Sequence, residues 1–283
     1  MRTSPDAPLE VRPAVPADEP AIRHLLEHTL NPSLYSWPWR EHLGQETFQV
    51  ALICGRPVGA LLAFLDAGPV AWVQLAALAS GVGVGPWLDR ILPPLVRPLR
   101  RLGGRVLAWM DVDGWVGPAL QARGFWPLSR LVTMVKQNRY LPAVEAAGVE
   151  LRRAEAADLP RLVRLDHAAF SPPWWFSVEA LDRLRRESLC FWVAEQEGRC
   201  LGYVEARLVE YGAHIGRLAV APRAQGQRIG GALLAEALAQ VWAQGVERVT
   251  LNTQEGNRAS QRLYDHFGFY LLGRRVVAWG RWL

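Results

Sequence analysis

The sequence predicts an α/β protein built from two tandem copies of one domain, each with a mixed, mostly antiparallel sheet flanked by helices. Two observations favour two domains: the chain has 283 residues, more than one domain commonly contains, and half of the residues are hydrophobic. The third observation is internal similarity. Segments of the first half reappear in the second half, in the same order, about 140 to 145 positions later.

The repeat begins with VRPAVPADEPAIRHLL from Val11, which is similar to LRRAEAADLPRLVRLD from Leu151. Each copy predicts a strand, an aspartate N-cap at Asp18 or Asp158, and an amphipathic helix. A Trp/Pro element follows in both copies, and then a two-strand pattern that turns at a glycine-containing segment. The similarity continues to a Gly-Phe pair near the end of each copy, so we expect domains at residues 1–142 and 143–283.

Local patterns in the second copy predict its elements in order. They are a strand, a helix, a helix near 178–187, three strands ending at Val220, a helix over 230–243, a strand over 248–253, a helix capped by Asn257 and a closing strand after Phe269.

Composition argues against several function classes. The net charge of +5 comes from arginines, since Lys136 is the only lysine, and acidic residues are scattered among them. Without a basic stripe, we do not expect nucleic-acid binding. The least polar stretch, Ala67–Leu88, contains Gln74, several glycines and two prolines, which favours a buried strand and loop over a membrane span.

Cysteines and histidines show no ligand or disulfide spacing. The three cysteines form no paired framework, and the N-terminal residues lack the apolar segment of a signal peptide. These features predict a cytoplasmic location. The six histidines show no metal-ligand spacing, so we expect no metal site.

The most informative segment is RLAVAPRAQGQRIGGALL, which starts at Arg217. It predicts a short apolar strand, a turn at Pro222, and a glycine-rich, basic loop that opens directly into a helix. The helix N-terminus exposes backbone N–H groups, and its dipole favours anions. Together with Arg223 and Arg228, the loop predicts a site for a diphosphate group.

Two motifs carry a family resemblance. The loop resembles the Q/R-x-x-G-x-G/A signature of the GNAT superfamily of N-acetyltransferases, with Arg228 where the family usually has its middle glycine. The segment NTQEGNRASQRLYDHFGF is similar to the family's N-x-x-S/A-x-x-L-Y-x-x-x-G-F motif. The resemblance covers the chain from about residue 149 to the C-terminus, and the first half resembles the family only through its similarity to the second.

The resemblance implies acetyl-CoA as co-substrate and direct transfer of the acetyl group to a primary amine. The acceptor is a small molecule or a peptide. The alternative is a catalytically silent module that binds CoA or a partner. The implied cofactor-binding residues are Leu218, Val220, Gln225, Gly226, Gln227, Arg228, Ile229, Gly230, Gly231 and Asn257.

The resemblance assigns Tyr264 as the acid that protonates the leaving thiolate, the alternative being a packing residue. The family often places a base six residues before the end of the central strand, which here is His214. Glu205 and Glu210 are rival bases, and His214 could instead be an ordinary polar strand residue. Asn257 could equally act as a helix N-cap.

The acceptor pocket in this family lies partly after the first helix, which implies Phe170, Trp174 and Trp175 as an aromatic wall; the alternative is core packing. Among the arginines, Arg217 could meet a phosphate or belong to a solvated face.

The first copy lacks this chemistry in the sequence alignment of the halves: Ala71 corresponds to His214 and Leu120 to Tyr264. We therefore expect it to be a structural copy. It would complete a monomeric pseudo-dimer, or the chain would form a homodimer.

Overall fold

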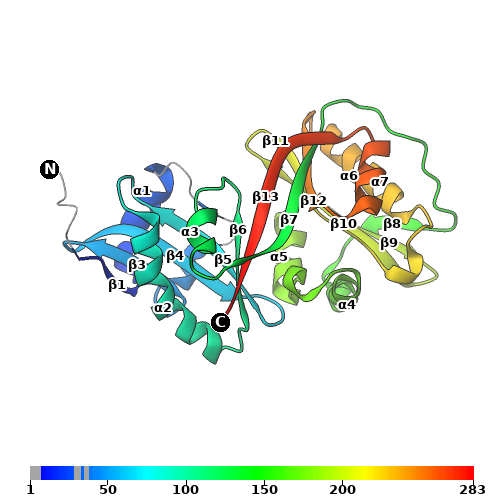
Figure 1. Ribbon diagram of the computed structural model, residues 1–283. Helices are drawn as coiled ribbons and strands as arrows, with labels where there is room; N and C mark the ends of the chain where they lie inside the picture. The colour runs from blue at the N-terminus through cyan, green and yellow to red at the C-terminus, as the bar shows by residue number, and fades with distance from the viewer. Residues whose placement is uncertain (1–7, 29–32, 35–37) are drawn as a thin grey trace. The chain divides into compact units, whose positions relative to one another are not determined.

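The structure is a computed structural model that describes residues 8–28, 33–34 and 38–283. The chain forms two compact units. Unit 1 comprises the residues up to Ser129 together with Val276–Leu283, and unit 2 comprises Arg130–Arg275. Each unit contains β-strands and α-helices, which confirms the predicted mixed α/β fold (Figure 1).

In unit 1 the strand order is β1-β3-β4-β5-β6-β13. All neighbours are antiparallel except β5 and β6. The elements are β1 (Glu10–Pro13), α1 (Glu19–His28), β2 (Ser33–Leu34), β3 (Phe48–Ile53), β4 (Arg56–Leu65), β5 (Val70–Leu78), α2 (Val84–Arg101), β6 (Val106–Asp111) and α3 (Gly117–Gln121), with 3-10 turns at Pro16–Asp18 and Trp39–His42.

Unit 2 repeats this plan with the order β8-β9-β10-β11-β12-β7, in which β11 and β12 form the parallel pair. The elements are β7 (Trp126–Lys136, which begins in unit 1), β8 (Glu150–Arg153), α4 (Leu159–Ala169), α5 (Val178–Glu187), β9 (Cys190–Gln196), β10 (Arg199–Val209), β11 (Gly212–Val220), α6 (Ile229–Ala243), β12 (Val249–Gln254), α7 (Arg258–His266) and β13 (Tyr270–Trp282, which ends in unit 1), with 3-10 turns at Ala156–Asp158, Pro172–Trp174 and Pro222–Ala224.

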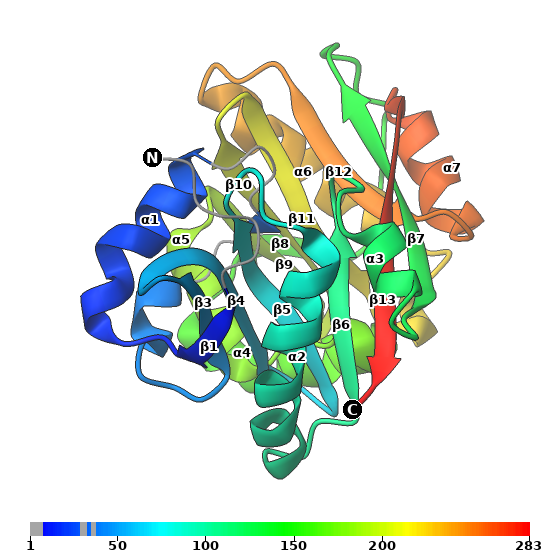
Figure 2. The same cartoon turned by 60° about the vertical axis from the view of Figure 1, so that its left-hand side comes forward.

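The last strand of each copy completes the sheet of the other unit. In unit 2, Leu131–Lys136 of β7 pair with β12, and in unit 1, Val277–Trp282 of β13 pair with β6 (Figure 2). The compact units therefore divide at two points in the chain, after Ser129 and after Arg275. The single boundary at residue 142 concerns the sequence repeat and stays a prediction.

The helices of unit 2 cover opposite faces of its sheet. Gly202 of β10 packs against α6, where a Cβ on the glycine would lie 3.0 Å from Leu233 Cδ1. The next residue, Tyr203, donates its hydroxyl hydrogen to Asp166 of α4 at 2.5 Å. Successive side chains of a strand point to opposite faces. Helix α4 therefore covers one face and α6 the other.

One ion pair is present in both units. Arg12 binds Asp18 in unit 1, and Arg152 binds Asp158 in unit 2, each by two guanidinium nitrogens. Each aspartate also accepts a backbone N–H bond from the residue three positions earlier, at 2.8 Å. The pair fixes the entry into the first helix of each copy and holds the pKa of both carboxyls below their usual range.

Lys136, the only lysine, lies fully buried at the end of β7. Its Nζ donates to Asn138 Oδ1 at 2.6 Å, to the Tyr140 carbonyl at 2.7 Å and to the Phe267 carbonyl at 2.5 Å. Since Phe267 follows α7, the ammonium binds the negative end of that helix. Three converging acceptors match the three hydrogens of an ammonium, and burial lowers the pKa of Lys136.

Candidate active site

The parallel strands of unit 2 separate beyond a short paired segment. Pairing between β11 and β12 covers only Ala213–Ile215 with Val249–Leu251, although β11 continues to Val220 and β12 to Gln254. Strand β10 stays paired with the other edge of β11 throughout. Among the described residues, no strand pairs with the free edge of β11 from 216 to 220. Its backbone groups are therefore available to an extended ligand.

The separation begins at a β-bulge. The register between β10 and β11 shifts from Glu205–Arg217 to Ala206–Ile215, which leaves Gly216 as the extra residue. A Cβ at this position would collide with Glu205 Oε2 and Arg207 Nη1. Glycine at the bulge is therefore what allows these two side chains to lie across β11.

The predicted glycine-rich loop leads into the N-terminus of α6. Arg228 is the N-cap and has a left-handed backbone conformation with φ 62°. A left-handed residue is more readily glycine, which agrees with the family's usual residue at this position. The first helical bond is donated by Ala232 to the Arg228 carbonyl, so the preceding N–H groups of α6 are available to an anion.

The side chains of this loop divide into two groups. Ile229 and Gly231 are buried, and Gly231 packs against Val144 and Phe267, so they could meet a ligand only through their backbone. Gln225 and Gln227 are exposed, and their side-chain amides donate to the carbonyls of Val220, the last residue of β11, and of Arg223 in the loop. The other candidates are half-buried or exposed: Leu218, Val220, Gly226, Arg228, Gly230 and Asn257.

Asn257 acts as the N-cap of α7, because its Oδ1 accepts the N–H of Ser260 at 3.1 Å. This is the structural alternative that the sequence left open, and an exposed Asn257 could also contact a ligand.

His214 lies on β11, beside the point where the strands separate. Its Nδ1 lies 2.9 Å from Thr250 Oγ1, and that hydroxyl donates to the Ala213 carbonyl at 3.2 Å. Thr250 Oγ1 must therefore accept the Nδ1 hydrogen, which leaves the lone pair on Nε2. Desolvation, with a smaller effect of Arg207, lowers the pKa of His214 to about 4. The imidazole is thus neutral and can accept a proton at Nε2.

The two rival carboxylates differ in accessibility. Glu205 is fully buried on β10, where it accepts bonds from Ser188 Oγ at 2.6 Å and Arg207 at 3.4 Å. Burial raises the pKa of Glu205. Glu210 is exposed after the end of β10. Of the three candidates, His214 combines proximity to the strand separation with a free acceptor atom.

Tyr264 lies on α7 and is 7% exposed. Burial raises the pKa of Tyr264 to about 12, so its hydroxyl keeps its hydrogen at neutral pH and can donate it. Its ring packs near Phe269 of the same motif, with 5.9 Å between the centroids.

The predicted aromatic wall lies in the connection between α4 and α5, and its three residues are half-buried. Phe170 stacks on the guanidinium of Arg217, and Trp175 Nε1 donates to the Phe170 carbonyl at 2.9 Å. The Trp174 carbonyl accepts a bond from Arg217. Arg217 itself is buried and paired with Asp166, so both sequence-based interpretations of it, a phosphate contact or a solvated arginine, are wrong.

Comparison with known proteins places this geometry in a family. The model of the Acetyltransferase (GNAT) family matches residues 155–269. A mycothiol acetyltransferase of Thermobispora bispora is 30% identical over 202 residues, which cover 60% of this chain and 68% of the relative. The chain belongs to the GNAT acetyltransferase family. It is an N-acetyltransferase.

Two solved structures share the fold of this GNAT protein over 97% of its length, each with a TM-score of 0.67. One is a GCN5-related N-acetyltransferase from Sphaerobacter thermophilus, 19% identical and matched over 95% of that chain. The other is a tandem GNAT protein from the clavulanic acid biosynthesis pathway, 17% identical and matched over 98% of that chain.

Unit 1 of the acetyltransferase keeps the fold and the bulge but not the polar residues. The register between β4 and β5 shifts at Gln74, as the register between β10 and β11 shifts at Gly216. Trp72 lies two residues before the first bulge and His214 two residues before the second, so Trp72, rather than Ala71, corresponds to His214. Leu120 corresponds to Tyr264, because each accepts a backbone N–H bond from a phenylalanine five positions later, Phe125 or Phe269. Neither replacement carries a proton-transferring group.

The edge of β5 in unit 1 also differs from that of β11. Leu75 and Ala76 pair with β4 on one side and with β2 on the other. A strand segment thus occupies the edge that corresponds to the free edge of β11. At the start of α2, Arg123 lies against Gly85 and pairs with Asp89.

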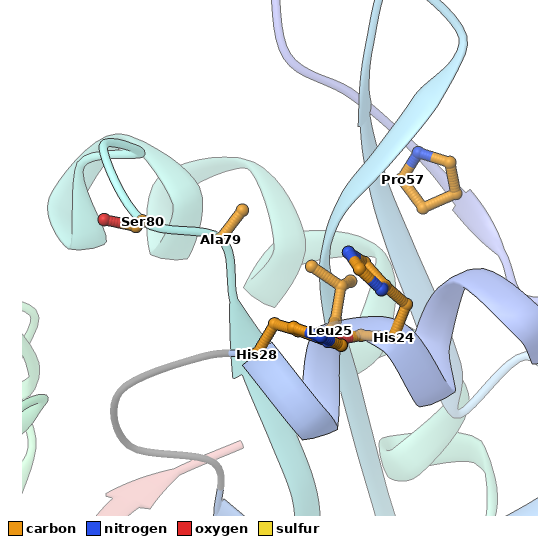
Figure 3. A pocket seen from close by; sticks show the side chains of 6 residues that line it. All are labelled: His24, Leu25, His28, Pro57, Ala79 and Ser80. Carbon is orange, nitrogen blue, oxygen red and sulfur yellow. The ribbon is translucent and has the colours of Figure 1, made fainter.

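A pocket of about 320 Å³ in unit 1 is lined by α1, β4 and the segment after β5 (Figure 3). The rings of His24 and His28, one turn apart on α1, stack at 4.0 Å between centroids. Among the residues that the structure describes, no acidic one lines this pocket, and no three metal-binding side chains gather. We assign no chemistry to it. None of the helices described here is long and apolar enough to cross a membrane.

Proposed function

We propose that unit 2 is an acetyl-CoA-dependent N-acetyltransferase that transfers the acetyl group directly to a primary amine of a small molecule or peptide. The observation that supports this most is the free edge of β11 beside the open N-terminus of α6. An extended pantetheine arm suits a free strand edge, and a diphosphate suits the helix terminus. The proposed binding residues are Leu218, Val220, the loop 225–231 and Asn257.

In the proposed reaction, bound acetyl-CoA supplies the thioester. His214 Nε2 accepts the proton of the acceptor amine as the new C–N bond forms. The C–S bond breaks, and Tyr264 gives its hydroxyl proton to the thiolate. Cys190 has no part, because burial raises the pKa of its thiol to about 12.

The acceptor would lie against the aromatic wall of Phe170, Trp174 and Trp175, which favours an apolar or peptide-like amine. Unit 1 would serve as a structural copy, since apolar residues replace His214 and Tyr264 there. We further propose a cytoplasmic protein that is a monomeric pseudo-dimer or a homodimer. The three free cysteines suit a reducing compartment.

The proposal is tested by measuring CoA release from acetyl-CoA across a panel of amines and peptides. We expect turnover with at least one acceptor, a loss of kcat in Tyr264→Phe, and a loss in His214→Ala. Turnover that is unaffected by both substitutions would contradict the assigned roles. Acetyl-CoA binding without turnover on any acceptor would instead support a silent binding module.

A further inference from the structure

A buried ion pair joins the central strand of unit 2 to the start of the aromatic wall. Arg217 of β11 donates from Nε and Nη2 to both oxygens of Asp166 on α4, at 2.6 to 2.9 Å. Asp166 is fully buried, and Arg217 is 9% exposed. The guanidinium lies between two rings, 3.6 Å from the centroid of Phe170 and 4.2 Å from that of Phe176.

The same pair holds the backbone of the connection between α4 and α5. Arg217 Nη2 donates to the Trp174 carbonyl at 2.5 Å, and Asp166 Oδ1 accepts the N–H of Phe176 at 3.1 Å. The hydroxyl of Tyr203 on β10 also donates to Asp166 Oδ2. Segment 170–176, which contains the proposed acceptor wall, is thus fastened to β11 one residue after the bulge.

Unit 1 folds without this arrangement. Aligning the helices on Asp18 and Asp158 places Leu26 where unit 2 has Asp166. The strand register places Leu75 and Ala60 where unit 2 has Arg217 and Tyr203. All three positions are apolar in unit 1, whereas the Arg–Asp pair at the entry to the helix is present in both units. The fold therefore forms in unit 1 without the buried pair, whereas the entry pair is common to both units.

Stability alone does not explain the buried pair. Removing two charges from water costs about as much as their attraction returns, and well-packed apolar residues are often equally stable or more stable. The pair instead restricts geometry, because its bidentate bond and the two rings stacked on the guanidinium hold the connection between α4 and α5 in one position.

We propose that Arg217 and Asp166 are positioning residues that hold segment 170–176 as a wall for an apolar or peptide-like acceptor. This inference rests on the proposed function of unit 2. Holding the amine in place accounts for a large part of catalysis in a direct transfer, and a displacement of about 1 Å can cost about 100-fold in rate.

The test replaces the three buried polar residues with apolar residues of similar size, since unit 1 is apolar at all three positions. The variant Asp166→Leu/Arg217→Met/Tyr203→Phe leaves no unpaired charge, so we expect cooperative unfolding to persist. The KM of acetyl-CoA should stay within about twofold, because the loop of α6 is untouched. The KM of the acceptor should rise about tenfold or more. Hydrogen exchange in segment 170–176 should become faster.

Arg152→Met is the matched control, because it removes an ion pair from the other end of the same helix. It should lower the melting temperature without changing the KM of the acceptor. If the triple variant does not fold, Arg217→Lys keeps the charge but loses the bidentate bond and should also raise the acceptor KM.

An unchanged acceptor KM with unchanged exchange in segment 170–176 would overturn the inference. An equal rise of the acceptor KM in Arg152→Met would overturn it too, since general loosening would then explain the effect. If the wild type acetylates no amine, the proposed function fails, and hydrogen exchange still decides whether the pair holds the segment.

Discussion

Acidification probes the environment of His214 directly. Its pKa is about 4 in the folded protein, against the ordinary 6.5 expected in the unfolded chain. Between these values the unfolded chain binds a proton that the folded protein does not, so stability falls as the pH drops from 6.5 to 4. At 1.36 kcal/mol for each pKa unit, and allowing for the half-buried ring, His214 should contribute about 2 to 3 kcal/mol of this loss.

The assay is urea unfolding of the wild type and of His214→Asn at several pH values from 4 to 8. The asparagine amide can still donate to Thr250, but it does not titrate. The stability of the wild type relative to the variant should therefore fall by about 2 to 3 kcal/mol over this range and stay constant above pH 7. If the difference in the free energy of unfolding between the wild type and His214→Asn does not change with pH, the pKa of His214 is the same in the folded and unfolded states, which would refute the reasoning.

Three further predictions concern other residues. Tyr264→Phe should lower kcat about 100-fold or more while the KM of acetyl-CoA stays nearly constant, measured by CoA release; a kcat within twofold of the wild type would remove Tyr264 from the reaction. Arg228→Gly should raise the free energy of unfolding by about 0.5 to 1 kcal/mol, because the left-handed conformation suits glycine, and should weaken CoA binding most at low salt. Lys136→Met should lower the free energy of unfolding by about 1 to 3 kcal/mol in urea, since it leaves the carbonyls of Tyr140 and Phe267 without their donor; an unchanged midpoint would contradict that role.

The sequence predicted those parts of the fold that local patterns determine. Helix α5 coincides with the helix predicted near residues 178–187, and α6 begins one residue before the predicted start at 230. The helical period of 3.6 residues in the apolar positions and the glycine-rich loop before α6 indicate these helices from neighbouring residues alone. The loop and the N-cap at Asn257 were found for the same reason.

The exchange of β7 and β13 could not be predicted, because an alternating apolar pattern identifies a strand but not its partner. The sequence likewise did not show on which face of the sheet the side chain of Arg217 lies. In the sequence it stands near the basic loop, but the alternation of β11 turns it toward α4. Aligning the two copies on their bulges, Gln74 and Gly216, gives Trp72 rather than Ala71 as the counterpart of His214, and the strand pairing that locates the bulges is not visible in the sequence. A charged residue in an otherwise apolar strand, and a single lysine in an arginine-rich chain, were the signals that could have revealed Arg217 and Lys136.

The stoichiometry of acetyl-CoA binding, measured by titration calorimetry on the full chain, tests most directly whether unit 2 alone carries the site. One molecule of acetyl-CoA for each chain is the expected result, because the free strand edge and the open helix N-terminus occur together only in unit 2 among the described residues. Two molecules for each chain would show that unit 1 also binds the coenzyme, and no binding would contradict the proposed site.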